Sequence, residues 1–213
     1  MPDIVITNLK DTAFSHEDVI ELIHLSFKER EAQGLHFSCS FMSGEEFAAD
    51  TKSGKTFVAV DPDSGQLVGT ASVRVYDKVG KKKYGLFEYL AVHPEAARRG
   101  IASKLLDTCI RSCHEDGGID ILSDTATPAR SSVRFHFKNG FRLDDIVSYP
   151  MTNYLSFVFR RECVRSSSQI QRDRYLWKIR YMGAYLRLGL LYKKDGGRTW
   201  FSRMYNKLMA VIK

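Results

Sequence analysis

The stretch that most limits the fold is LAVHPEAARRGIASKLL, residues 90 to 106. It predicts an apolar strand that leads, through a basic turn containing a glycine, directly into an amphipathic helix. A helix N-terminus presents backbone N–H groups and a partial positive charge, which suit a pyrophosphate. Arg98 and Arg99 add charge there, and Gly100 and Ala102 let a phosphate approach the backbone closely. The pattern therefore predicts a phosphate cradle, with an ordinary turn and two solvated arginines as the alternative.

Elsewhere, hydrophobic periodicity, caps and turn residues predict an alternation of strands and helices. The strands are expected at residues 4–9, 55–60, 66–76, 84–92 and 119–124, from 141 onward and at 151–159. The helices are expected at residues 15–34, 43–51, 99–114 and 129–138. The three consecutive strands before residue 93 predict an antiparallel meander. The helix that follows them predicts a crossover, so strand 119–124 should run parallel to strand 84–92.

With these motifs in this order, the sequence resembles the GCN5-related N-acetyltransferase (GNAT) superfamily. Gly100 and Ala102 match the last two places of the family's main motif, whereas Ala97 departs from the Arg or Gln of the first place. LAVHP is a frequent lead-in to that motif, and RFHFKNGF, residues 134 to 141, is similar to the family's second signature. The resemblance covers about residues 3 to 159 and implies an α+β fold, a mixed and mostly antiparallel sheet flanked by helices on both faces. We expect a GNAT-like domain over residues 1–160 and a basic amphipathic helical extension over residues 161–213.

The resemblance also implies acetyl-CoA as co-substrate, with its pantetheine arm between the fourth and fifth strands, which splay apart. Residues Leu90, Ala91 and Val92 map to that edge, and the pyrophosphate turn maps to Arg98, Arg99, Gly100, Ile101, Ala102 and Ser103. Ser132 and Phe135, on the second crossover helix, would line the far side of the opening. The implied activity is transfer of an acetyl group to a primary amine of a small molecule or biosynthetic intermediate. A catalytically inactive CoA-binding regulatory or scaffold module is the alternative, and transfer of a longer acyl group is a third hypothesis.

Two residues are candidates for proton transfer. Glu88 is in a place where the family often keeps a base, and the alternative is a solvated strand carboxylate paired with a lysine such as Lys83. Simple alternation puts Glu88 on the face of Leu90, but a bulge in this strand would reset that parity. His136 occupies the place of the family's tyrosine acid, and the alternative is a histidine that packs against the cofactor sulfur or bonds to a backbone carbonyl.

Acceptor recognition is expected from two aromatic-rich segments. One is the loop of residues 34–43, and the other is residues 149–154 near the last strand. Neither segment identifies the amine.

The net charge of +7 is unevenly distributed. Residues 1–159 carry 18 Lys and Arg against 22 Asp and Glu, whereas residues 160–213 carry 14 against 3. A nucleic-acid partner for the whole chain therefore does not follow from the basic pI, and any acidic partner should bind the last quarter of the chain.

The four cysteines are too scattered for a disulfide framework. Cys109 and Cys113 suit buried small hydrophobic residues, and His114 suits a surface position, better than the three suit a metal site, so no metal is expected. No leader or membrane-crossing stretch is visible, and a cytoplasmic location is expected.

The basic tail predicts a helix over about residues 169–194. Its apolar residues are Tyr175, Leu176, Ile179, Met182, Leu186 and Leu190, widened by Trp177, Tyr181, Tyr185, Leu188 and Tyr192. After Gly196 and Gly197, a second short helix is expected around Trp200, Met204, Leu208 and Val211. This hairpin is expected to pack on the core or on a sister subunit as a homodimer; contact with an anionic membrane is the alternative, and nucleic acid is less favoured.

Overall fold

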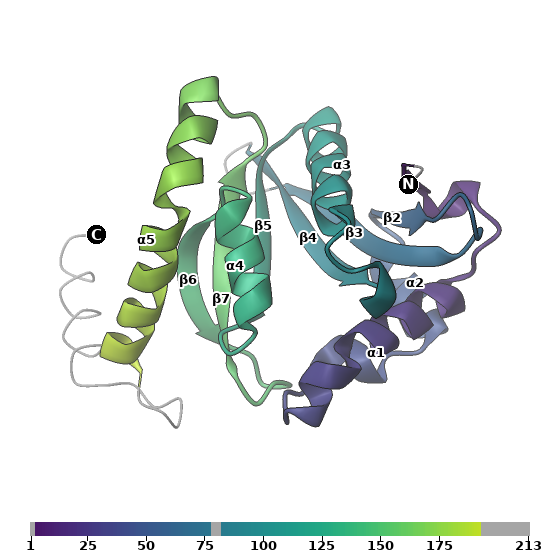
Figure 1. The fold of residues 1–213 in the computed structure, drawn as a ribbon, viewed down its shortest axis with the longest axis horizontal. Helices are drawn as coiled ribbons and strands as arrows, with labels where there is room; N and C mark the ends of the chain where they lie inside the picture. Colours follow the sequence, from purple (N-terminus) through teal and green to yellow (C-terminus); the bar gives the residue numbers. More distant parts are fainter. Residues whose placement is uncertain (1–2, 78–81, 193–213) are drawn as a thin grey trace. The chain divides into compact units, whose positions relative to one another are not determined.

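Seven strands form one mixed sheet in the described residues, 3–77 and 82–192 of this computed structural model (Figure 1). Their order is β1-β2-β3-β4-β5-β7-β6. β1 to β4 pair antiparallel, and β4 pairs with β5 parallel, as the crossover through the intervening helix requires. The strands are β1 (Val5–Asn8), β2 (Lys55–Val60), β3 (Leu67–Asp77), β4 (Lys83–Val92), β5 (Gly118–Ala126), β6 (Arg142–Ser148) and β7 (Leu155–Glu162). The expected fold class, a mixed and mostly antiparallel sheet with helices, is confirmed.

The first two helices begin at serine caps that the sequence indicates. The α-helices of the described residues are α1 (His16–Ala32), α2 (Gly44–Thr51), α3 (Ile101–Glu115), α4 (Arg130–Lys138) and α5 (Ser167–Leu191). Ser15 forms a capping box with Asp18 before α1, and Ser43 forms one with Glu46 before α2. These boxes satisfy amide groups that a helix start leaves without an acceptor, so the helix starts were readable from the sequence.

The chain divides into two compact units. The first comprises Met1–Asp124, Pro150–Asn153 and Arg160–Arg165, and the second comprises Thr125–Tyr149, Tyr154–Phe159 and Ser166–Lys213. The segment after residue 160 is thus shared between the units, and the expected division of the chain at that residue stays a prediction.

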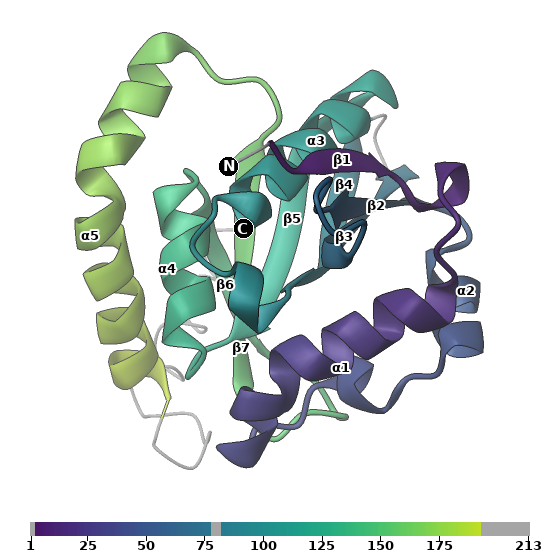
Figure 2. The ribbon, with the colours of Figure 1, turned by 45° about the vertical axis from the view of Figure 1, so that its right-hand side comes forward.

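In the first unit, helices cover both faces of the β2–β4 meander. Figure 2 shows α1 and α2 together on one side of this unit. Their contact with the sheet is a buried apolar cluster made of Leu9, Val19, Ile20, Ile23, Phe47, Val58 and Ala91. On the other face α3 lies close to β3, because a Cβ at Gly69 would come within 2.9 Å of Ile101 Cγ2 and 3.1 Å of Leu105 Cδ1. Gly69 thereby sets how near the start of α3 lies to the sheet.

In the second unit, aromatic rings form the core between α4, α5 and the strands. Phe137 of α4 meets Phe159 of β7 edge-on at 5.1 Å. Tyr185 of α5 contacts Phe157 at 5.3 Å, and its hydroxyl donates to Thr127 O at 2.6 Å. The helix α5 is therefore part of this unit's core through its aromatic side.

The expected helix of the tail is present, but its apolar residues divide between two faces. Tyr181, Ala184 and Tyr185 pack inward, whereas Tyr175, Ile179, Met182 and Leu186 are exposed. The second helix expected around Trp200 lies outside the described residues. Within the described ranges, no helix combines the length and the apolar character that crossing a bilayer requires.

Candidate active site

Strands β4 and β5 pair along only part of their length. The parallel pairing joins Lys83–Leu86 of β4 to Gly118–Leu122 of β5. Among the described residues, the remaining part of β4, residues 87–92, has no partner on β5. This stretch contains Leu90, Ala91 and Val92, the residues expected to bind a pantetheine arm. An unpaired strand edge offers N–H and C=O groups to an extended ligand, so the local geometry suits that expectation.

A β-bulge interrupts β4 where the unpaired stretch begins. The register on β3 passes from Ser72↔Glu88 to Thr70↔Ala91, so two residues of β4 oppose one of β3, and Tyr89 has a φ of 55°. The bulge therefore places Glu88 and Ala91 on the same face, the one covered by α1 and α2. Simple alternation along β4 therefore does not hold, and the bulge left open as an alternative from the sequence is present.

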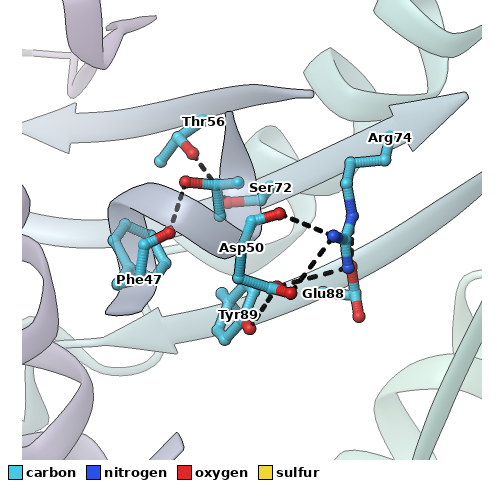
Figure 3. Close-up of polar contacts among 8 residues, drawn as sticks. Phe47, Asp50, Thr56, Ser72, Arg74, Glu88 and Tyr89 are labelled. Carbon is cyan, nitrogen blue, oxygen red and sulfur yellow. Dashed lines mark hydrogen bonds and ion pairs between the residues drawn. The ribbon is translucent and has the colours of Figure 1, made fainter. Parts of the chain in front are cut away.

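The bulge gathers four polar side chains on this face (Figure 3). Arg74 of β3 donates from Nη2 and Nε to Glu88 Oε2 at 2.5 and 3.1 Å. The same guanidinium donates from Nη1 to the backbone oxygen of Asp50 on α2 at 2.6 Å, and its Nη2 lies 3.3 Å from Asp50 Oδ2. Tyr89 donates its hydroxyl proton to that Oδ2 at 2.6 Å. Two carboxylates thus share one guanidinium, and the cluster carries one net negative charge when both are ionised.

Burial raises the pKa of the Glu88 carboxyl, although the hydrogen bond and charge of Arg74 act to lower it and the nearby Asp50 carboxylate raises it further. The side chain is only 26% exposed. Both bonds from Arg74 go to Oε2, and among the described residues Oε1 has no hydrogen-bond donor. A carboxylate with a raised pKa and one oxygen outside its ion pair can accept a proton.

Glu88 therefore differs from the solvated strand carboxylate considered from the sequence. Its partner is Arg74, whereas Lys83 lies 3.8 Å from Asp77. The pairing with a lysine was wrong because Lys83 begins β4, five residues before Glu88.

The turn before α3 has the geometry of an anion cradle. Gly100 is the N-cap of α3 with a φ of 79°, and a Cβ built on it meets no atom within 4 Å. The amides of Ser103 and Lys104 both donate to Gly100 O, so those of Ile101 and Ala102 have no acceptor inside the helix. A diphosphate fits this arrangement, because open space adjoins outward-facing amides at the positive end of a helix.

The two arginines of the turn differ in their environment. Arg99 donates from Nη1 to Asp61 Oδ2 at 2.8 Å and is half-buried. Arg98 is exposed, with a φ of 65°. Arg98 is therefore the better placed of the two to contribute its charge to an anion in the turn.

The remaining expected site residues lie on α4 in the second unit. Ser132 and Phe135 are half-buried, and His136 is 3% exposed. The His136 ring stacks on Phe159 at 4.6 Å, and its Nδ1 lies 2.8 Å from Ser132 O, so Nδ1 carries the proton of that bond. Burial lowers the pKa of His136 to about 4, which leaves the ring neutral at pH 7. These contacts favour the packing alternative, and the acid role of His136 stays a prediction.

The comparison with protein families matches residues 17–141 to the model described as "Acetyltransferase (GNAT) family". That match covers more than half of the chain. The chain belongs to the GNAT acetyltransferase family. The comparison with curated protein sequences gives no significant match.

Solved structures show the same GNAT fold at low sequence identity. A GNAT-family acetyltransferase from Staphylococcus aureus Mu50 is 21% identical with a TM-score of 0.58, over 76% of this chain and 100% of that one. A chain of the NatC complex bound to Gag peptide and CoA is 18% identical with a TM-score of 0.59, over 76% and 99%. A GNAT-family acetyltransferase from Elizabethkingia anophelis with acetyl-CoA bound is 15% identical with a TM-score of 0.53, over 76% and 99%.

The two segments expected to recognise the acceptor meet in this GNAT domain. The amide of His36 donates to Asn153 Oδ1 at 3.0 Å, and Asn153 Nδ2 donates to Gly34 O at 2.7 Å. Phe41 and Met151, one in each segment, are 76% and 81% exposed. The segments are therefore tied by side-chain–backbone bonds and present large apolar groups to solvent.

Sequence reasoning missed three members of the Glu88 cluster, namely Asp50, Arg74 and Tyr89. For Arg74 a signal existed, since the meander puts β3 beside β4 and a cross-strand ion pair is common there. Asp50 gave no such signal, because the packing of α2 on the sheet, through Phe47 and Tyr89 at 5.0 Å, brings it to the cluster.

Proposed function

We propose that this protein transfers an acetyl group from acetyl-CoA to a primary amine of a small molecule or biosynthetic intermediate. The observation that carries the proposal is the coincidence, on β4, of an unpaired strand edge with the buried carboxylate of Glu88. Family membership supports the acetyl transfer, and the presence of CoA or acetyl-CoA in two structures of the same fold supports the co-substrate.

This chain holds the co-substrate through backbone groups and one exposed cation. The amides of Ile101 and Ala102 and the guanidinium of Arg98 would bind the diphosphate, and residues 90–92 would bind the pantetheine arm in the manner of an added strand. When bound there, acetyl-CoA supplies an activated thioester carbonyl. Backbone N–H groups beside the bulge would stabilise the negative charge that develops on that carbonyl oxygen.

Glu88 acts as the base. An amine is protonated at neutral pH and cannot attack a carbonyl until it loses a proton, directly or through water. Glu88 Oε1 accepts that proton, while Arg74 fixes the carboxylate through Oε2. The net negative charge of the cluster formed by Asp50, Arg74 and Glu88 also attracts a cationic acceptor.

The acceptor enters past the two tied segments. Phe41 and Met151 offer apolar contact to the body of the substrate, which favours a small or medium amine with an apolar part. The four free cysteines support a reducing, cytoplasmic setting for the reaction.

Thiol release from acetyl-CoA across a panel of amines tests the proposed activity. We expect turnover with at least one small primary amine. We also expect the protein to bind CoA, which calorimetry measures separately. CoA binding without turnover on a broad panel would instead support the inactive regulatory module, which the Ala97 departure and the packed, neutral His136 favour. An absence of both binding and turnover would contradict the two functions together.

The turn before α3 gives a matched pair of variants for co-substrate binding. We expect Arg98→Ala to weaken CoA binding about 10- to 150-fold, because a charge-assisted bond to phosphate contributes roughly 1.5–3 kcal/mol. Arg99→Ala should weaken it less, since Asp61 already pairs with Arg99. Titration calorimetry at two salt concentrations measures both affinities. A larger loss from Arg99→Ala would show that Arg99, and not Arg98, contacts the phosphate.

A further inference from the structure

The outward side of α5 carries a row of apolar side chains that the acetyltransferase activity does not use. The row consists of Tyr175, Ile179, Met182 and Leu186, which are 74%, 66%, 70% and 65% exposed. Their spacings of four, three and four residues place them on one helical face. We call these four residues the outer row.

The opposite side of α5 already has its packing partners. Ala184 is 3% exposed, Tyr181 meets Phe137 at 6.4 Å, and Lys138 lies over the ring of Trp177 at 5.2 Å. The Tyr185 hydroxyl is held by Thr127 O. The inner side thus anchors α5 within its own unit, and the outer row is not needed for that packing.

Charge distinguishes the surroundings of the outer row. Arg172, Arg174 and Lys178 are exposed on α5 near its apolar residues. The only acidic residue of α5, Asp173, is 3% exposed and lies 2.6 Å from Arg180 in an ion pair. The solvent-facing surface of α5 therefore combines apolar groups with cations and has no acidic side chain.

We propose that the outer row docks this protein on an anionic lipid bilayer, with α5 lying in the plane of the interface. The apolar row extends for about 16 Å along the helix, and its side chains would enter the acyl boundary while the cations meet lipid phosphates. Lipid headgroups supply negative charge along the whole row. A second copy of α5 would instead bring the same cations together, which like-charge repulsion disfavours.

The sequence beyond α5 is consistent with this surface. Residues 192–213, which follow α5, carry six Lys and Arg against one Asp, so the positive charge of α5 continues along the sequence. The docking proposal is independent of the acetyl acceptor and of the catalytic role of Glu88.

Vesicle flotation of the full chain tests the proposal. We expect binding to vesicles of phosphatidylcholine that contain phosphatidylglycerol, weaker binding as salt is raised, and little binding to phosphatidylcholine alone. The double variant Ile179→Glu, Met182→Glu should bind anionic vesicles at least about tenfold more weakly, since it places two charges at the acyl boundary. Lys178→Glu should lower binding by more than about fivefold, because it removes a positive charge near the headgroups and adds a negative one.

Met151→Glu is the matched control, because Met151 is 81% exposed but lies outside α5. It should bind vesicles as the unaltered chain does. All substituted side chains are exposed, so thermal unfolding should be unchanged and would verify that each variant is folded. Absence of vesicle binding, or binding that the double variant leaves unchanged, would overturn the proposal. A dimer in sedimentation that the double variant dissociates, without vesicle binding, would also overturn it and assign the outer row to a self-association surface.

Discussion

Glu88→Gln is expected to lower kcat/KM for the amine by about 100- to 1,000-fold, within the range that a general base contributes. Glutamine keeps a carbonyl oxygen that can accept from Arg74, so the polar cluster and the bulge remain, but it cannot take a proton from the ammonium group. CoA affinity should stay within about twofold, because the diphosphate of CoA is bound at the turn before α3 and not by the cluster that contains Glu88. Thiol release at saturating acetyl-CoA, with calorimetry for CoA, separates the two effects.

The pH profile gives the readout that distinguishes a base from a structural carboxylate. Since burial raises the pKa of Glu88, its ionised form is lost at a higher pH than for an exposed glutamate, and kcat/KM should fall as pH decreases through that raised pKa. Glu88→Gln should remove this inflection, leaving only the titration of the amine. Asp116→Asn, which alters an exposed carboxylate paired with Lys55, serves as the control and should leave rate and profile unchanged. Wild-type rates in Glu88→Gln would exclude Glu88 as the base.

Features set by neighbouring residues could be predicted from the sequence. The capping boxes at Ser15 and Ser43 need only residues three positions apart. The turn before α3 needs a residue that adopts a positive φ, and the glycine at position 100 indicates it. The order of the strands through β4 and the parallel β5 followed from consecutive elements and a right-handed crossover. Even the bulge in β4 could be anticipated as an option, although only the register on β3 showed that it lies at Tyr89.

Features set by contacts distant in sequence could not be predicted. Asp50 reaches Arg74 and Tyr89 only because α2 packs on the sheet, whereas the neighbouring strands of the meander did offer a signal for the Arg74–Glu88 salt bridge. The helix α5 shows the same limit in another form. Apolar residues surround most of its circumference, so periodicity alone did not say that Tyr181 and Tyr185 would face the core while Ile179 and Met182 face solvent.

His136 makes the stability of this protein depend on pH in a definite window. Its pKa is lowered by burial from 6.5 to about 4, and the hydrogen bond to Ser132 O offsets only part of that effect. Between these two values the unfolded chain binds a proton at this histidine and the folded chain does not, so protonation favours unfolding as pH falls. The free energy of unfolding should therefore decrease by about 2–3 kcal/mol between pH 7 and pH 4.5 through this residue alone.

Urea unfolding of His136→Phe at the two pH values measures that contribution. Phenylalanine preserves a ring that can stack on Phe159 but cannot make the bond to Ser132 O, so the variant should be less stable at pH 7, by about 1 kcal/mol, yet lose much less stability at pH 4.5. His114→Gln, at an exposed position of α3, should keep the full decrease in stability.

The variant His136→Phe also decides the role of His136 in catalysis. If His136→Phe turns over acetyl-CoA at nearly the normal rate while the pH dependence of its stability is reduced, His136 is a buried packing histidine. A loss of turnover beyond about 100-fold with the fold intact would support the acid role instead, since that is the scale of a lost proton donor.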